Sequence, residues 1–153
     1  VLYIIENNQY GMGTSISKVA AGSDLYKRGE PFGIPGEKVD GMDILKVIKA
    51  ADKAAKYVRS GKGPYIIEMQ TYRYKGHSMS DPGQYRSKKE LKNYKSKDPI
   101  EKLKKFIIKK KILKLNKINE IDSEIFNIIK KAAEFAEKSP KPSLEDLYED
   151  VYA

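Results

Sequence analysis

Residues 44–71 read ILKVIKAADKAAKYVRSGKGPYIIEMQT, and this stretch predicts a helix followed by a strand. In its first part, apolar side chains recur every three or four positions with lysines on the opposite face, which is typical of an amphipathic helix. We expect this helix over residues 43–60, with Asp43 near its positive end. The Gly-Lys-Gly-Pro run at 61–64 ends it. Residues 65–71 then form a strand.

A second strand is predicted at residues 1–5, VLYII, and we expect it to be buried because no polar residue alternates with the apolar ones. Two strands joined by a helical crossover form a parallel, right-handed β-α-β unit, so both end at the same edge of one sheet. Asn8, after the first strand, and the loop that begins at residue 72 therefore meet at that edge. The fold class is α/β, with a parallel sheet flanked by helices.

Asn7 and Asn8 occupy a position that ligands favour, because open parallel sheets bind them at the carboxyl ends of their strands. The sequence therefore allows a cofactor or metal site here. The commoner alternative is an Asn that only ends a strand or adopts a left-handed turn.

The remaining elements are predicted from shorter signals. Residues 16–41 are mostly loop, with a short helical turn near 23–28 and a brief strand around Val39. A loop this long is often functional, although its glycines also suit a disordered excursion. Further helices are expected at residues 88–94, 98–111 and 119–138, with a capped turn after Ser143 and a short strand or tail at 149–153.

Residues 72–86, YRYKGHSMSDPGQYR, are expected to be a loop because glycine and proline interrupt them repeatedly. The loop contains His77, the only histidine of the chain, together with Arg73, Arg86 and Asp81. Hydrogen-bonding and cationic side chains on a loop after a strand are typical of phosphate-binding or catalytic sites. An exposed polar turn is the alternative.

Composition narrows the function classes. The chain has 153 residues, 40% of them hydrophobic, and a net charge of +9, as expected for one basic globular domain. Residues 95–117 hold ten lysines against Asp98 and Glu101. Nucleic-acid surfaces favour arginine and aromatic residues, so we expect a solvated helix face and no nucleic-acid partner. A basic interaction module remains the rival class.

Other features are absent from the sequence. Cysteine is missing, which excludes disulfides and thiolate chemistry. No apolar run approaches the ~20 residues of a membrane span, so no membrane partner is expected. The chain opens inside an apolar run without Met, which we interpret as a fragment of a larger protein.

Four segments carry a family resemblance: ENNQYGMGTS at 6–15, YKRG at 26–29, VDGMD at 39–43, and the 72–86 loop. In order from residue 1 to 98, and more loosely to the end, the chain resembles the α subunits of pyruvate dehydrogenase E1 components, thiamine-diphosphate-dependent 2-oxo acid dehydrogenases. The resemblance implies a thiamine-diphosphate-binding fold, whose cofactor motif opens with Gly-Asp-Gly and closes with Asn-Asn. Only the closing half occurs in this sequence.

The resemblance also assigns the candidate site residues. The Asn8 side-chain oxygen and the Tyr10 carbonyl would ligate Mg²⁺, which bridges to the diphosphate. His77, our candidate catalytic residue, would reach the diphosphate from a mobile loop, and Arg73 would add a permanent cation. Asp81 would hold the loop. Tyr85 and Arg86 stay open between scaffolding and direct function, as does Arg73.

The implied activity is that of an oxidoreductase: decarboxylation of pyruvate on thiamine diphosphate, then acetyl transfer to the lipoyl group of the E2 dihydrolipoyl acyltransferase. The implied assembly is an α₂β₂ heterotetramer in which the E1 β subunit supplies the activating carboxylate. This chain alone is expected to be inactive. Another 2-oxo acid or acetoin dehydrogenase α subunit remains an alternative.

The resemblance further implies a division into a β-α-β core with a long loop at 1–71, a cofactor loop region at 72–97 and a helical region at 98–153, all in the C-terminal part of one domain.

Ser78 and Ser15 correspond to serines that are phosphorylated in eukaryotic relatives. A phosphate at Ser78 would repel the cofactor diphosphate. A further regulatory serine is missing, because Gln84 precedes Tyr85 and the loop is one residue shorter. This departure favours a bacterial, cytoplasmic enzyme over one of the mitochondrial matrix.

Overall fold

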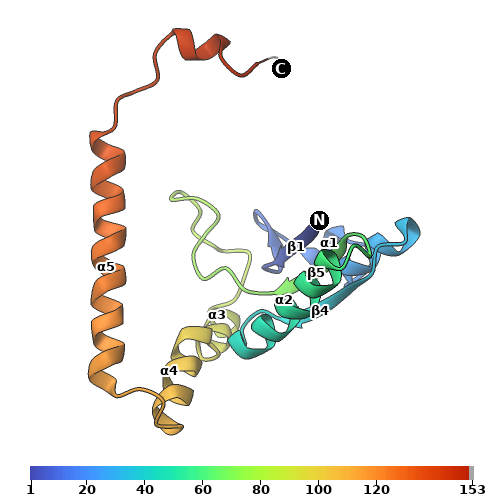
Figure 1. The fold of residues 1–153 in the computed structure, drawn as a ribbon, viewed down its shortest axis with the longest axis horizontal. Helices are drawn as coiled ribbons and strands as arrows, with labels where there is room; N and C mark the ends of the chain where they lie inside the picture. Colours follow the sequence, from blue (N-terminus) through green and yellow to red (C-terminus); the bar gives the residue numbers. More distant parts are fainter. Residues whose placement is uncertain (152–153) are drawn as a thin grey trace. The chain divides into compact units, whose positions relative to one another are not determined.

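The computed structural model describes residues 1–151, which divide into two compact units, 1–106 and 107 onward (Figure 1). The first unit contains the sheet and the loops at its edge. Its strands are β1 (Leu2–Asn7), β2 (Tyr10–Gly11), β3 (Thr14–Ser15), β4 (Gly36–Asp40) and β5 (Tyr65–Gln70), and its helices are α1 (Ile16–Val19), η1 (Leu25–Phe32), α2 (Ile44–Arg59), α3 (Lys88–Lys95) and α4 (Pro99–Lys109), the last of which crosses the boundary.

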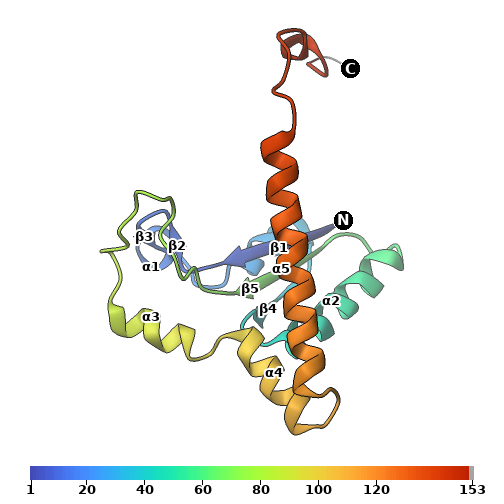
Figure 2. The ribbon, with the colours of Figure 1, turned by 90° about the vertical axis from the view of Figure 1, so that its left-hand side faces the viewer.

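The main sheet has three parallel strands in the order β1-β5-β4, visible side by side in Figure 2. β1 runs in register with β5 from Leu2 opposite Tyr65 to Asn7 opposite Gln70. The expected parallel α/β arrangement is therefore confirmed. The brief strand foreseen around Val39 is β4, which pairs with the other side of β5. The strand that α2 joins to β5 is therefore β4 and not the first strand, as was expected, although β1 still lies parallel to β5.

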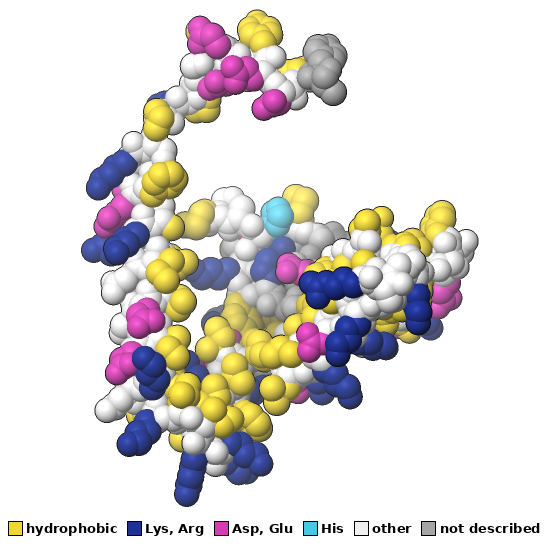
Figure 3. All heavy atoms as spheres, viewed as in Figure 1, with side chains coloured by type: hydrophobic (Ala, Val, Ile, Leu, Met, Phe, Trp, Pro, Cys, Tyr) yellow, Lys and Arg dark blue, Asp and Glu magenta, His cyan; other side chains and the backbone are white. Residues whose placement is uncertain are grey.

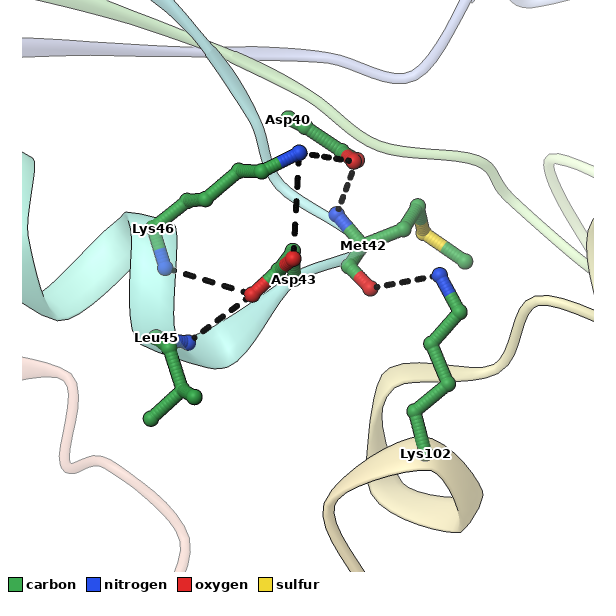
Figure 4. A network of polar contacts seen from close by, with 6 residues as sticks. All are labelled: Asp40, Met42, Asp43, Leu45, Lys46 and Lys102. Carbon is green, nitrogen blue, oxygen red and sulfur yellow. Dashed lines mark hydrogen bonds and ion pairs between the residues drawn. The ribbon is translucent and has the colours of Figure 1, made fainter. Parts of the chain in front are cut away.

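α2 begins directly after Asp43, where the sequence predicts a helix, and the carboxylate of Asp43 caps its first turn (Figure 4). The Asp43 side chain accepts hydrogen bonds from the backbone N–H groups of Leu45 and Lys46 at 3.1 and 3.3 Å. Lys46 Nζ lies 3.3 Å from Asp40, which also accepts the N–H of Met42. A cap of this kind contributes about 1 kcal/mol to helix stability.

The core lies between α2 and the central strand β5. Ile67 of β5 and Ala54 of α2 are both fully buried, and Val39, Ala50 and Tyr65 complete the buried cluster. β5 is buried along Tyr65–Glu68 because strands pair with it on both sides. This central strand therefore positions the sheet edge from which the loops leave.

The expectation that the first strand is buried was wrong. Tyr3 is 50% exposed and Ile4 is 54% exposed. β1 is an edge strand of a three-stranded sheet, and α2 packs mainly against β5. An apolar run shows what a strand is able to bury, whereas its neighbours determine what it does bury.

The segment between β1 and β4 is more regular than a loop. β2 and β3 form a small antiparallel hairpin with Met12 at a positive φ of 53°. η1 extends the helical turn expected at 23–28 to residue 32. A side chain at Gly29 would overlap Ile66, so η1 packs closely on β5 and the segment is not a disordered excursion.

Helices follow the 72–86 loop as predicted. α3 and α4 begin after capping residues: Ser87 accepts the N–H of Glu90, and Asp98 accepts those of Ile100 and Glu101. The lysine side chains of residues 95–117 are exposed, except that of Lys104, which is half-buried. That placement agrees with the expected solvated helix face.

The second unit holds α5 (Leu115–Lys138) and η2 (Glu145–Tyr148). α5 begins one turn before the expected residue 119, and Figure 3 shows hydrophobic and lysine side chains exposed along it. Leu144, and not the expected Ser143, occupies the cap position of η2. Residues 149–151 form no strand, and 152–153 of the expected strand or tail lie outside the described part. Within residues 1–151, no helix is long and apolar enough to cross a membrane.

We predict that Ile67→Ala lowers the free energy of unfolding by about 2–5 kcal/mol, because Ile67 is fully buried and its truncation leaves a cavity. Ile48→Ala, at a position 52% exposed on α2, should cost about 1 kcal/mol or less. Urea denaturation followed by circular dichroism measures both values. Equal costs for the two substitutions would contradict the assigned core.

Candidate functional site

The carboxyl ends of β1 and β5 lie together at one edge of the sheet, as the topology predicts. The Thr71 N–H donates to the Asn7 carbonyl at 3.0 Å, and the Gly41 N–H donates to the Gln70 carbonyl at 2.9 Å. The two candidate segments, the turn at Asn8–Tyr10 and the 72–86 loop, therefore leave the sheet as neighbours.

The Asn8–Tyr10 turn is a compact Asx turn. The Asn8 Oδ1 accepts the Tyr10 N–H at 3.0 Å, while Gln9 between them adopts a left-handed φ of 76°. The turn borders an open pocket of about 350 Å³, whose lining also includes Leu25 and Arg28. An amide oxygen keeps a second lone pair after accepting one hydrogen bond. Asn8 can therefore still ligate a cation.

The side chain of Tyr10 is hydrogen-bonded to α3. Its hydroxyl and that of Tyr72 each donate to the same oxygen, Glu90 Oε1, at 2.8 Å. Burial, reinforced by the hydrogen bond to Glu90, raises the pKa of Tyr10 to about 12. Tyr72 in turn stacks on Tyr94 with ring centroids 3.9 Å apart. Both hydroxyls therefore stay protonated as donors, and α3 anchors the turn and the loop together.

The base of the 72–86 loop is closed by Arg86. Its guanidinium donates to three consecutive carbonyls, those of Arg73, Tyr74 and Lys75. It also lies over the rings of Tyr72 and Tyr85, at 5.4 and 5.8 Å from their centroids. Of the roles left open for Arg86, the geometry supports scaffolding.

The tip of the loop is organised around Asp81. Its carboxylate accepts the backbone N–H groups of His77 and Gly83, both at 2.7 Å, and the Tyr85 hydroxyl at 2.8 Å. These bonds, that from His77 above all, lower the pKa of Asp81 to about 2. A side chain at Gly76 would overlap the Asp81 carbonyl oxygen, so only glycine allows the loop to fold back this closely.

Arg73 links the two segments. Its Nη2 donates to the Met12 carbonyl at 2.5 Å and to the Tyr85 hydroxyl at 2.9 Å, and its Nη1 lies 3.4 Å from His77 Nδ1. Its Nε is buried without a hydrogen-bond partner in residues 1–151. Because a guanidinium only donates, this contact is a hydrogen bond in the tautomer whose Nδ1 accepts and whose Nε2 carries the proton. The exposed His77 therefore presents an N–H donor outward.

The two candidate regulatory serines differ in setting. Ser78 is exposed on the loop, with its Oγ 3.1 Å from that of Ser80. Ser15 is half-buried before α1, with its Oγ 3.0 Å from that of Ser17. Ser78 is thus the more accessible of the two hydroxyls.

The donor chemistry fits the groups that the resemblance implies. The described residues contain no cluster of three His, Asp or Glu side chains able to hold a metal, and the turn itself offers the neutral oxygens of Asn8 and Tyr10. Oxygen donors suit the hard cation Mg²⁺. His77 and Arg73 supply donors suited to a diphosphate.

Two carboxylates of this region are not among the site residues that the sequence predicts. Glu68 is fully buried in β5. The sequence marks it only as a single acidic residue inside an apolar strand. Glu90 had no such signal, because its tyrosine partners are 80 and 18 positions away along the chain.

Comparisons with known proteins assign the family. The model of the family described as "Dehydrogenase E1 component" matches residues 1–145. The pyruvate dehydrogenase E1 component subunit alpha of Rhizobium meliloti is 49% identical over 152 residues, which are 99% of this chain and 44% of that protein. Its counterpart in Rickettsia bellii is 47% identical over 99% of this chain and 47% of its own length.

The mitochondrial somatic form from Rattus norvegicus is 51% identical over 154 residues, which are 99% of this chain and 39% of the rat protein. The chain thus spans less than half the length of these relatives. It is similar to α subunits from both bacteria and mammalian mitochondria. On the match of the family model, the chain belongs to the dehydrogenase E1 component family.

Proposed function

We propose that this chain contributes the α-subunit part of a thiamine-diphosphate and Mg²⁺ site in a pyruvate dehydrogenase E1 enzyme. The observation that supports this most directly is the joining of two segments at one sheet edge by the hydrogen bond from Arg73 to the Met12 carbonyl. One segment carries the oxygen donors of Asn8 and Tyr10, and the other carries the nitrogen donors of His77 and Arg73.

Each residue has a distinct role in the proposed site. The Asn8 Oδ1 and the Tyr10 carbonyl hold Mg²⁺. Glu90 restrains Tyr10 by accepting the hydrogen bond of its hydroxyl. His77 donates to the diphosphate through Nε2, and Arg73 offsets its charge. Thiamine diphosphate, when bound, supplies the electron sink for decarboxylation. The chain binds and orients the cofactor, and the activating carboxylate comes from the β subunit.

The proposed reaction is the oxidative decarboxylation of pyruvate, with acetyl transfer to the lipoyl group of the E2 acyltransferase. The names of the relatives, "E1 component" and "subunit alpha", support a β-subunit partner in an α₂β₂ assembly. We place it in a bacterial cytoplasm. The regions 1–71, 72–97 and 98–153 act as parts of one cofactor-binding domain, and phosphorylation of Ser78 or Ser15 would act against the cofactor phosphate.

The direct test is the activity of the assembled α and β pair. We expect thiamine-diphosphate- and Mg²⁺-dependent decarboxylation to be fastest with pyruvate when it is assayed beside branched-chain 2-oxo acids and acetoin. Faster turnover of either competitor would reassign the substrate. No activity with any of the three would contradict the enzyme class.

For His77→Ala in that pair, we expect the affinity for thiamine diphosphate to fall roughly ten- to hundredfold, the effect of losing a hydrogen bond to a charged group. Calorimetric titration in the presence of Mg²⁺ measures it. Lys75→Ala removes an exposed cation from the same loop and serves as the control. Unchanged affinity in His77→Ala would refute its role.

Gly76→Ala should loosen the loop, because the new methyl group would overlap Asp81. We expect faster tryptic cleavage within 73–86 and weaker cofactor binding. Gly22→Ala, where a side chain would meet nothing within 4 Å, is the matched control. The loop geometry is wrong if both variants are cleaved at the rate of the wild type.

A further inference from the structure

A buried carboxylate lies next to the Asn8–Tyr10 turn without contributing to it directly. Glu68 of β5 is 0% exposed. Its Oε1 accepts the Asn7 Nδ2 at 2.7 Å, and its Oε2 accepts the backbone N–H of Tyr26 at 3.1 Å. Within residues 1–151 it forms no ion pair. A buried carboxylate is costly unless its oxygens are hydrogen-bonded, and these two donors, with the charge of Lys38 opposite it in β4, offset that cost.

The donors and acceptors of this network can be assigned in only one way. The backbone N–H of Gln9 donates to the Asn7 Oδ1 at 3.2 Å, and a backbone N–H can only donate. The amide oxygen of Asn7 therefore faces Gln9, and its NH₂ group must face Glu68. Asn7 is 6% exposed, so its amide is largely shielded from water. Glu68 thus sets the orientation of the Asn7 amide.

The oriented Asn7 amide stabilises Gln9 in a strained backbone conformation. Gln9 has a φ of 76°, a left-handed conformation that costs a residue other than glycine about 1–2 kcal/mol. The Gln9 side chain adds a second bond, from Nε2 to the Asn7 carbonyl at 3.2 Å. The left-handed residue reverses the chain between Asn8 and Tyr10, so that the Tyr10 N–H reaches the Asn8 Oδ1.

We propose that Glu68 is a positioning residue for the cation-binding turn: it fixes the Asn7 amide, which holds Gln9 left-handed and so sets Asn8 and Tyr10 side by side. Through Tyr26 the same carboxylate ties the start of η1 to the turn. The inference deepens the proposed function and rests on it, because Mg²⁺ is the cation that the turn would hold.

The polarity argument can be tested by exchanging the two groups. Asn7→Asp alone sets two carboxylates against each other. In Glu68→Gln alone, the introduced amide has only one oxygen. Its NH₂ group must therefore face either the Asn7 Nδ2 or the Tyr26 N–H, which sets two donors against each other. In Asn7→Asp/Glu68→Gln, the introduced amide donates to the introduced carboxylate and accepts from Tyr26. The other oxygen of that carboxylate accepts from Gln9, so every group is again paired.

The variants are made in the whole α chain and assembled with the β subunit. Mg²⁺ affinity is titrated calorimetrically in the presence of thiamine diphosphate, and thermal melting is followed separately. We expect each single substitution to weaken Mg²⁺ binding roughly five- to hundredfold, as for an unpaired buried polar group. The double substitution restores affinity. Asn93→Asp, an exposed change on α3 that adds the same charge, leaves it unchanged.

The outcomes separate the inference from the function on which it rests. A wild-type pair that binds no Mg²⁺ with thiamine diphosphate refutes the proposed function and the inference with it. Normal wild-type binding with unchanged affinity in both single variants overturns the inference alone, even if their melting temperatures fall. If the single variants do not assemble, the double variant decides: restored assembly and affinity support the positioning role, and their absence refutes it.

Discussion

The parallel pairing of β1 with β5 is the constraint on which the arrangement of the site depends. Its register sets Asn7 opposite Gln70, and the ladder continues through the bond from Thr71 to the Asn7 carbonyl. The Asn8–Tyr10 turn and the 72–86 loop therefore begin as neighbours. A slip of one residue would turn every side chain of a strand to the other face and would separate Glu68 from Asn7. Backbone pairing thus decides which functional groups meet.

Beyond the sheet edge, polar contacts rather than a hydrophobic core hold the two segments. Tyr10 and Tyr72 share Glu90, Arg73 reaches the Met12 carbonyl, and Arg86 closes the loop on its own backbone. Each of these hydrogen bonds involves a charged group and contributes about 1.5–3 kcal/mol, so a few of them give the loop a defined shape. A segment with few buried apolar contacts nevertheless opens locally at a lower cost than the core of the sheet. That property suits a loop proposed to close over a diphosphate.

The parts that the sequence predicted correctly depend on local signals. Helical periodicity, a capping Asp and a Gly-Pro stop determine α2. The rule that parallel strands end at the same sheet edge was enough to bring together the loops that follow β1 and β5. Burial of β1 was predicted wrongly because it depends on the layers that cover a strand. β4 carries little apolar signal and takes its place by backbone pairing. The carboxylates of Glu68 and Glu90 find their partners far along the chain, which no local pattern records.

A crystal structure of the assembled α and β subunits with thiamine diphosphate and Mg²⁺ tests most directly whether this sheet edge is the cofactor site. We predict the Asn8 Oδ1 and the Tyr10 carbonyl oxygen at about 2.0–2.1 Å from Mg²⁺, the distance that this cation requires. His77 should lie within hydrogen-bond distance of the diphosphate. A cation coordinated away from Asn8 and Tyr10, or a diphosphate out of reach of the 72–86 loop, would contradict the account.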